Sequence, residues 1–254
     1  LVETFSSDIS TMSWFSIAYL ISGTGLMLSM GWLGDVLGQR RMYLAGLVIF
    51  TIGLGFVSVS QNISQLISAR IFQAIGMALV LANASAIITA MFPGKRERGK
   101  ALGVVSMIVG IGLCAGPLLG GFLLQYMDWR TVYWVRIPLA TIALPLAFMF
   151  IRDQRTNRRE PLKVDYLGMV LLYATIVLSL IAVNLAGKWG ISSPWVWGIA
   201  TMAAVHLPLL ILVERRATRP ILDLDLFKIR GFCFYIFFII ILPKWIFYGR
   251  TRFD

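Results

Sequence analysis

The chain has few of the side chains on which most catalytic and metal-binding chemistry depends. Its 254 residues include a single histidine, His206, and two cysteines, Cys114 and Cys233. Both cysteines lie in apolar segments without the spacing of a metal or redox motif, so we expect them to be small buried hydrophobic residues. One histidine and two isolated cysteines cannot assemble a zinc site or a Cys–His nucleophile pair. We therefore expect no catalytic residue, no metal site, no cofactor and no enzymatic activity.

Acidic residues are also scarce, with 12 Asp and Glu against 23 Lys and Arg, for a formal net charge of +11. In a soluble protein this charge would suggest nucleic acid as a partner. Here the basic residues form short clusters between apolar runs rather than one basic face, so we expect no nucleic-acid partner. Hydrophobic residues make up 58% of the chain and the mean hydropathy is +0.80, well above the values of soluble domains. The expected partner of most of the surface is the lipid bilayer.

Long apolar runs predict an all-α integral membrane protein, a polytopic helix bundle. A helix needs about 20 mainly apolar residues to cross the hydrocarbon layer, and a spanning helix satisfies its own backbone hydrogen bonds. The last of the predicted spans is interrupted by Pro243 and Lys244. The eight predicted spans are 13–33, 43–60, 64–91, 100–126, 131–151, 164–185, 194–213 and 231–248.

The basic residues are distributed unevenly between alternate loops, and this predicts the orientation. Cytoplasmic loops retain Lys and Arg, so the side with more of them is expected to be cytoplasmic. We therefore expect a multi-pass protein of the plasma (inner) membrane with its basic loops in the cytoplasm. The clusters on that side hold 16 of the 23 basic residues: 40–41, 95–100, 152–163 and 215–230.

The same rule places the N-terminus outside, in a stretch with Glu3 and Asp8 but no base. An exported N-terminus without a signal peptide needs a preceding helix, so we expect one more span upstream of Leu1. Two basic, proline-containing linkers then divide the chain. The expected parts are a partial six-helix bundle with five helices present (1–151), a cytoplasmic linker (152–163), an inserted helix pair (164–213), and a second linker with the first helix of a truncated C-terminal half (214–254).

A short loop motif, GWLGDVLGQRR, connects the first two spans at residues 31–41. Gly31 permits close helix approach, and Gly38 gives the backbone freedom to turn. Asp35 can cap a helix N-terminus or pair with a base such as Arg40 or Arg41. The simpler alternative is a loop whose two arginines only set the topology.

An arginine lies about two turns into the third span, where a charge costs roughly 2.5–3.5 kcal/mol on insertion scales. Arg70 is followed at i+3 by Gln73. We expect its side chain to face protein or a water-filled cavity; the alternative is that it reaches the outer headgroups.

Glycines recur every four residues in the fourth span. Gly112, Gly116 and Gly120 form a groove in which another helix can lie, and Pro117 removes a backbone donor and bends the segment. Gly121 follows directly. Generic helix packing would explain the glycines alone, but not the Gly-Pro step.

Together these motifs resemble those of the major facilitator superfamily. Residues 31–41 resemble its loop signature G-x-L-x-D-x-x-G-x-R-R/K, residues 70–76 its R-x-x-Q-G motif with Ala74 in place of the glycine, and residues 112–121 its antiporter motif G-x-x-x-G-P-x-x-G-G. The resemblance implies a conformational-switch role for the loop, a proton-coupling role for Arg70 and Gln73, and helix packing by the glycines and Pro117. It also implies an incomplete bundle that lacks the first helix and most of the C-terminal half.

Further segments are similar to those of fourteen-helix drug:proton antiporters. Residues 129–138 resemble the start of the sixth family helix, with Arg136 at a position where asparagine is usual, and residues 164–168 and 219–227 resemble the segments that flank the extra helix pair. We expect the Arg136 side chain to reach outward to the headgroups. Asp165 is a candidate proton carrier, although its place at a helix start favours N-terminal capping. No Asp or Glu lies in the middle of a span, so the family's acidic site would lie upstream of Leu1.

The resemblance implies a proton-coupled exporter of small amphipathic or cationic compounds, driven by the proton gradient. The expected partners are a small-molecule substrate, the bilayer and the missing remainder of the transporter. Two alternatives stay open: a major facilitator porter for another solute, such as a siderophore, sugar or metabolite, and a non-transporting scaffold or degenerate product.

Overall fold

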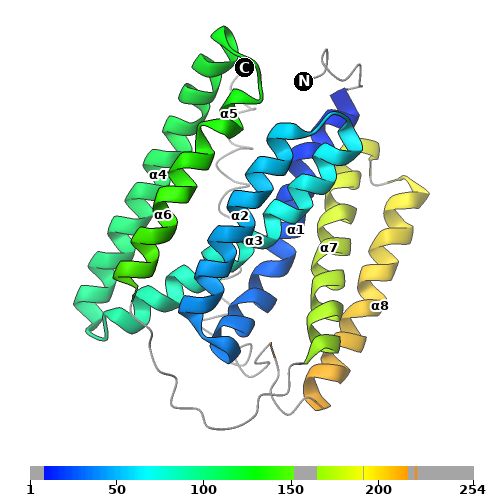
Figure 1. Cartoon of the computed structure of the whole chain (residues 1–254). Helices are drawn as coiled ribbons and strands as arrows, with labels where there is room; N and C mark the ends of the chain where they lie inside the picture. Colours follow the sequence, from blue (N-terminus) through cyan, green and yellow to red (C-terminus); the bar gives the residue numbers. More distant parts are fainter. Residues whose placement is uncertain (1–8, 152–164, 191, 217–220, 222–254) are drawn as a thin grey trace, which may run out of the picture.

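The computed structural model describes residues 9–151, 165–190, 192–216 and 221, and that part of the chain is helical without a strand (Figure 1). The all-α prediction is therefore confirmed. The helices are α1 Ile9–Leu37, α2 Gln39–Val59, α3 Ile63–Met91, α4 Lys95–Tyr126, α5 Thr131–Trp134, α6 Arg136–Phe150, α7 Tyr166–Trp189 and α8 Pro194–Arg216.

Within the described residues seven segments are long and apolar enough to cross a membrane. They correspond to the first seven predicted spans; the eighth, at 231–248, lies outside the described residues. Three helices begin at least four residues earlier than predicted, α1 at Ile9, α2 at Gln39 and α4 at Lys95. In α2 and α4 a polar first turn continues the helix before the apolar run starts. Helices α5 and α6 form one span, Thr131–Phe150, interrupted at Val135. Pro138 explains the interruption, since it has no N–H to donate to the carbonyl of Trp134.

The helices run alternately up and down, so the predicted basic clusters at 40–41, 95–100 and the end of α8 lie at one end, here called the basic end (Figure 1). Helices α1, α2 and α3 pack on one another in the centre. Helix α6 packs against α2 on one side, and α7, which carries α8, packs against α1 on the other. The predicted inserted pair, α7 and α8, therefore contacts the first bundle through α1. That this pair is a separate part of the chain remains a prediction.

Two glycines allow α2 and α3 to approach each other closely. A Cβ atom on Gly76 of α3 would lie 2.4 Å from the Phe50 nitrogen and 2.8 Å from the Gly46 oxygen, both on α2. These are backbone atoms, which cannot move aside as a flexible side chain can. Without side chains at Gly46 and Gly76, the two helices pack backbone to backbone, as small residues permit in membrane bundles.

Apolar side chains from several helices meet at the end opposite the basic end. The cluster brings together α1, α2, α3, α5 and the short segment before α5, so short α5 is fastened to the central helices. Its buried members are Phe15, Leu54, Val57, Leu66, Ala69, Trp129 and Tyr133.

Helix α4 differs from the others because none of its residues is buried. It contacts only α3 and α5 among the described helices, so most of its length has no protein neighbour there. Cys114, expected to be buried, is exposed on this helix. The expectation was wrong because apolar surroundings in sequence do not distinguish a side chain that faces protein from one that faces lipid.

Candidate functional site

The loop motif lies at the basic end, where α1 ends and α2 begins. Gly38 has a φ of +104°, a conformation that side-chain-bearing residues rarely adopt, and its N–H donates to the Gly34 carbonyl at 2.9 Å. No side chain caps α2. The suggestion that Asp35 caps a helix is therefore wrong: its exposed carboxylate instead accepts a hydrogen bond from Gln39 Nε2 at 3.0 Å. Asp35 forms no ion pair with another described residue.

The two arginines of the motif have different surroundings. Arg40 Nη2 donates to the Phe148 carbonyl at 2.8 Å, and its guanidinium carbon lies 4.7 Å from the centre of the Phe148 ring. The Phe148 carbonyl is one of the last four of α6, which have no partner in the helix and carry its negative dipole end. Arg40 thus ties the turn to α6, whereas Arg41 is exposed.

Gly34 of the same motif lies against a buried asparagine of α3. Asn83 is 1% exposed, and its Nδ2 donates to the Met30 carbonyl of α1 at 3.2 Å and to the Leu79 carbonyl at 2.8 Å. A Cβ atom on Gly34 would lie only 1.6 Å from Asn83 Oδ1. At Gly31, by contrast, a Cβ atom would meet Ala82 Cβ at 3.6 Å, an ordinary contact. Helix α3 thereby positions the end of α1 next to the turn.

Arg70 lies in protein rather than at the headgroups, with 9% of its surface exposed. Its Nη1 donates to Gln73 Oε1 at 2.9 Å, one helical turn along α3, and its Nη2 donates to Tyr133 Oη at 2.6 Å. Its Nε is buried without a hydrogen-bond partner among the described residues. The guanidinium is therefore shielded from lipid by the surrounding protein, and its described hydrogen-bond partners are neutral.

Aromatic rings enclose the Arg70 guanidinium. Its carbon lies 4.1 Å from the ring centre of Phe15, 5.0 Å from that of Tyr19 and 4.9 Å from that of Tyr133. Such cation–π contacts stabilise a desolvated arginine by about 2 kcal/mol or more. We call Arg70, Gln73, Phe15, Tyr19 and Tyr133 the arginine cage; it joins α1, α3 and α5.

Short α5 is held in position by the residues directly before it. Arg130 pairs with Asp128 at 3.2 Å, and its Nη2 donates to the Ser60 carbonyl at the end of α2 at 2.9 Å. The buried Trp129 ring lies edge-on to the Tyr133 ring, with 6.0 Å between centres. These contacts place Tyr133 over Arg70. Arg136, one turn further on, is exposed, and its guanidinium carbon lies 5.9 Å from the Tyr133 ring centre.

The glycines of the antiporter-like motif face open space. A Cβ atom added at Gly112, Gly116, Gly120 or Gly121 would meet nothing within 4 Å. Pro117 lies inside the continuous helix α4. The packing role of this motif stays a prediction, because no described helix lies against it.

Asp165 caps the N-terminus of α7, the alternative that its position favours. Its Oδ1 accepts a hydrogen bond from the Gly168 N–H at 2.9 Å, while Oδ2 is buried without a described partner. The structure brings Arg70 and Gln73 together but places Asp165 and the loop motif at the basic end, away from them. No group of three or more metal-binding side chains is found in the described part of the chain.

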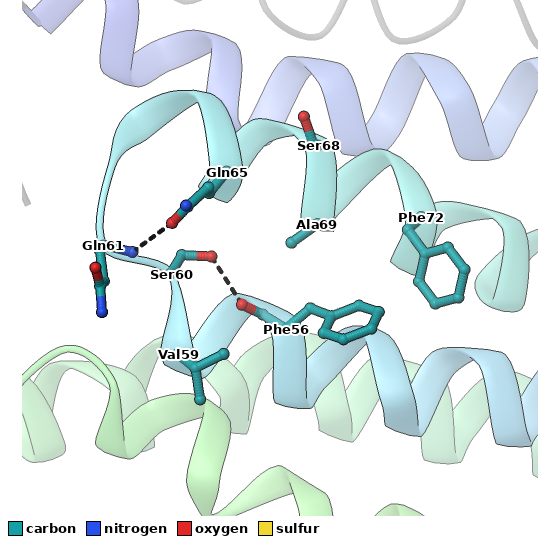
Figure 2. Close-up of a pocket in the computed structure, with 8 residues that line it drawn as sticks. All are labelled: Phe56, Val59, Ser60, Gln61, Gln65, Ser68, Ala69 and Phe72. Atoms are coloured by element: carbon teal, nitrogen blue, oxygen red, sulfur yellow. Dashed lines mark hydrogen bonds between the residues drawn. The ribbon is translucent and has the colours of Figure 1, made fainter.

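Two pockets lie between the central helices. One of about 530 Å³ lies at the end of the α2–α3 hairpin opposite the basic end, and Figure 2 shows amides and hydroxyls at its mouth and two phenylalanine rings deeper along the helices. Its lining contains no charge: Phe56, Val59, Ser60, Gln61, Gln65, Ser68, Ala69 and Phe72. The other, of about 480 Å³, lies between α1 and α3 at the basic end and includes Gly31, Trp32 and Asp35.

Sequence reasoning missed Phe15, Tyr19, Tyr133 and Asn83. The partners of Arg70 lie on other helices, up to 63 residues away in the chain, and aromatic residues are too common in membrane spans to mark a site. Asn83 gave a weak signal, as a lone amide within an apolar run. An intramembrane polar residue of this kind usually bonds to a neighbouring helix.

Comparison with known proteins identifies the family. The sequence profile of the Major Facilitator Superfamily matches residues 1–246. The riboflavin transporter RibZ of Clostridioides difficile (strain 630) is 35% identical over 232 residues, which cover 91% of this chain and 49% of RibZ. The multidrug transporter protein MdtP of Bacillus subtilis (strain 168) is 31% identical over 229 residues, covering 89% of this chain and 41% of MdtP.

A third relative, the multidrug resistance protein Stp of Mycobacterium tuberculosis (strain CDC 1551 / Oshkosh), is 29% identical over 226 residues, covering 89% of this chain and 42% of Stp. The chain spans about half the length of the curated relatives that it matches. The matched family consists of transporters rather than enzymes, in agreement with the helical membrane fold. The chain is a multi-pass membrane protein and belongs to the major facilitator superfamily.

Proposed function

We propose that residues 1–254 are part of a proton-coupled efflux transporter that exports small amphipathic or cationic compounds across the plasma membrane. The observation that carries this proposal is the arginine cage: Arg70 is 9% exposed, within a membrane span, and bonded only to neutral described groups. A charge in such a place is expensive to insert and is typically retained for function.

Arg70 can act on protonation through its field. In a medium of low dielectric constant a fixed positive charge favours the ionised form of a carboxyl group brought near it. The carboxyl group itself would come from the remainder of the transporter, which completes a binding site between two halves near the midplane. Binding and release of a proton there would then be linked to the positions of the two halves.

The basic-end turn would act as the conformational switch. Arg40 holds the turn on the end of α6, and the Asp35 carboxylate is exposed with only a glutamine partner among the described residues. The Asp35 carboxylate could thus pair with a basic residue in the rest of the transporter in one of the inward- and outward-facing states, and lose that ion pair in the other. With the basic loops in the cytoplasm, this switch would act on the cytoplasmic side.

A second candidate is uptake or export of one specific metabolite. Of the three relatives named above, RibZ is named a riboflavin transporter, whereas MdtP and Stp are named for multidrug transport and resistance. These names divide between the two candidates, so the choice needs a substrate test.

The test uses a full-length transporter that contains this chain, reconstituted in vesicles with an imposed pH gradient. The panel contains ethidium, a neutral and an anionic fluorescent amphipathic compound, and riboflavin. We expect export of several amphipathic compounds, accompanied by proton movement in the opposite direction and abolished by a protonophore. Transport that is independent of the gradient would contradict proton coupling, and movement of riboflavin alone would favour the second candidate.

A further inference from the structure

A second guanidinium, that of Arg136, lies beside the arginine cage. Its carbon is 5.9 Å from the centre of the Tyr133 ring, and the carbon of Arg70 is 4.9 Å from the same centre. Arg70 is buried, whereas Arg136 is exposed. The tyrosine therefore has one enclosed cation and one accessible cation close to its ring.

No described carboxylate balances these two positive charges. Arg70 donates to the neutral Gln73 and Tyr133, and the nearby Asp128 pairs with Arg130. Arg70 Nε is buried and has no hydrogen-bond partner among the described residues. Two guanidinium groups on neighbouring spans, without a carboxylate beside them among the described residues, create a positive potential that an anion would stabilise.

The ring faces that point into the cage are occupied by the Arg70 guanidinium. Aromatic cages commonly recognise cations, but the rings of Phe15, Tyr19 and Tyr133 already contact the Arg70 guanidinium, at 4.1, 5.0 and 4.9 Å. A second cation at this place would meet the two like charges of Arg70 and Arg136. The local chemistry therefore favours a negative group over a positive one.

We propose that Arg136 and the Arg70–Tyr133 pair form a subsite for the carboxylate of an amphipathic compound, and that Arg136 selects anionic over cationic substrates. A guanidinium presents two parallel donors that match a carboxylate. Tyr133 Oη accepts from Arg70, which leaves its own proton available to donate. This inference rests on the proposed function in treating the ligand as a transported compound, and it narrows the proposed substrates to amphipathic anions in place of cations.

The test measures binding, without a gradient, to the purified chain in nanodiscs of zwitterionic lipid. The probes share one ring system and differ in charge: anthracene-9-carboxylate, 9-anthracenemethanol and 9-anthracenemethylammonium. Their fluorescence is titrated against the chain and corrected for partition into empty nanodiscs. The variants are Arg136→Asn, the conservative Arg136→Lys, and Lys188→Gln as the control, which removes one exposed charge at the same end of the bundle.

We expect the carboxylate to bind most tightly, and Arg136→Asn to weaken it about tenfold or more while the alcohol is unaffected. Arg136→Lys should retain part of the affinity, and Lys188→Gln all of it. Equal binding of the carboxylate and the alcohol, or equal losses in Arg136→Asn and Lys188→Gln, would overturn the proposal. Displacement by chloride at equal concentration would show an inorganic anion site instead.

Two features keep the test decisive. If Arg136→Asn does not insert, the relative affinities of the three probes for the unmodified chain and for Arg136→Lys still test the proposal. Because binding is measured without a gradient, loss of proton-coupled export would leave this result unchanged. Conversely, intact export without carboxylate selectivity would remove the subsite and leave the proposed function standing.

Discussion

Individual residues at the basic-end turn are constrained by steric contact as well as by charge. Gly34 lies where a Cβ atom would collide with Asn83 Oδ1 at 1.6 Å, and Asn83 is held by carbonyls of both α1 and α3. The side chain of Asn83 cannot move away without losing these hydrogen bonds. A small residue on α1 is therefore needed for α3 to position the turn.

Substitution of this glycine should destabilise the bundle. We expect Gly34→Ala to lower the free energy of unfolding by about 1–3 kcal/mol through overpacking, measured as thermal unfolding in detergent. Gly31→Ala is the matched control, because its Cβ atom would make only an ordinary contact. The double change Gly34→Ala with Asn83→Ala should recover part of the loss. Equal melting temperatures for the two alanine variants would contradict this packing.

Asp35 should serve transport rather than folding. It is exposed and its one described partner is Gln39, so Asp35→Asn, which keeps an acceptor oxygen, should leave membrane abundance nearly normal. If the turn is a switch, loss of the charge shifts the balance between inward-facing and outward-facing states. A change of about 1.4 kcal/mol in the free-energy difference between them changes their ratio tenfold. Turnover by the full-length transporter should fall. Loss of the protein from the membrane would instead give Asp35 a structural role.

At the scale of helices, the turn is attached to α6 through Arg40. The Arg40 guanidinium donates to a free carbonyl at the end of α6 and lies over the Phe148 ring. Lysine has a single ammonium group and stacks less well on a ring. This contact joins residues 108 positions apart, so it connects the start of α2 to the end of the α5–α6 span.

The paired arginines give a matched comparison. We expect Arg40→Lys to destabilise the chain by about 1 kcal/mol, seen as a melting temperature lower by a few degrees. Arg41→Lys should have no measurable effect, because Arg41 is exposed. Equal shifts in the two variants would mean that the arginines act only through their charge.

Alanine substitution should have different effects on stability at a glycine of α3 and at a glycine of α4. Gly76→Ala places a Cβ atom 2.4 Å from the Phe50 backbone nitrogen, so we expect loss of folded protein. Gly116→Ala meets nothing within 4 Å and should leave the melting temperature of the chain unchanged. In a full-length transporter, however, Gly116→Ala should reduce efflux if another helix packs on α4. A destabilised Gly116→Ala chain, or unchanged efflux, would contradict this assignment.

Sequence patterns predicted the local features of the fold and missed those that depend on distant contacts. Apolar runs predicted the first seven spans, position at a helix start favoured the Asp165 cap, and the cost of a charge inside a span predicted that Arg70 faces protein. The aromatic partners of Arg70 and the Arg40–Phe148 contact depend on how helices pack, which a single sequence does not display. Hydropathy also failed to separate exposed α4 from buried α3, because lipid and protein interiors favour the same residues.

At the scale of the whole molecule, the central helices connect the turn at the basic end to the arginine cage near the opposite end. Helices α1, α2 and α3 pack closely, with the turn at the basic end and the arginine cage towards the other. Halves that rock as rigid units would carry both features together. Because the chain spans about half the length of the relatives that it matches, we expect residues 1–254 by themselves to insert without proton-driven efflux.

The central claim, that the Arg70 cage serves transport rather than folding, is tested most directly by Arg70→Ala. The measurement is proton-driven efflux by the full-length transporter, normalised to the amount of protein in the membrane. Removing a costly buried charge should leave insertion no worse, so we predict near-normal abundance with impaired efflux and loss of its dependence on the pH gradient. Full gradient-driven efflux by Arg70→Ala would contradict the claim, as would failure of the variant to accumulate in the membrane.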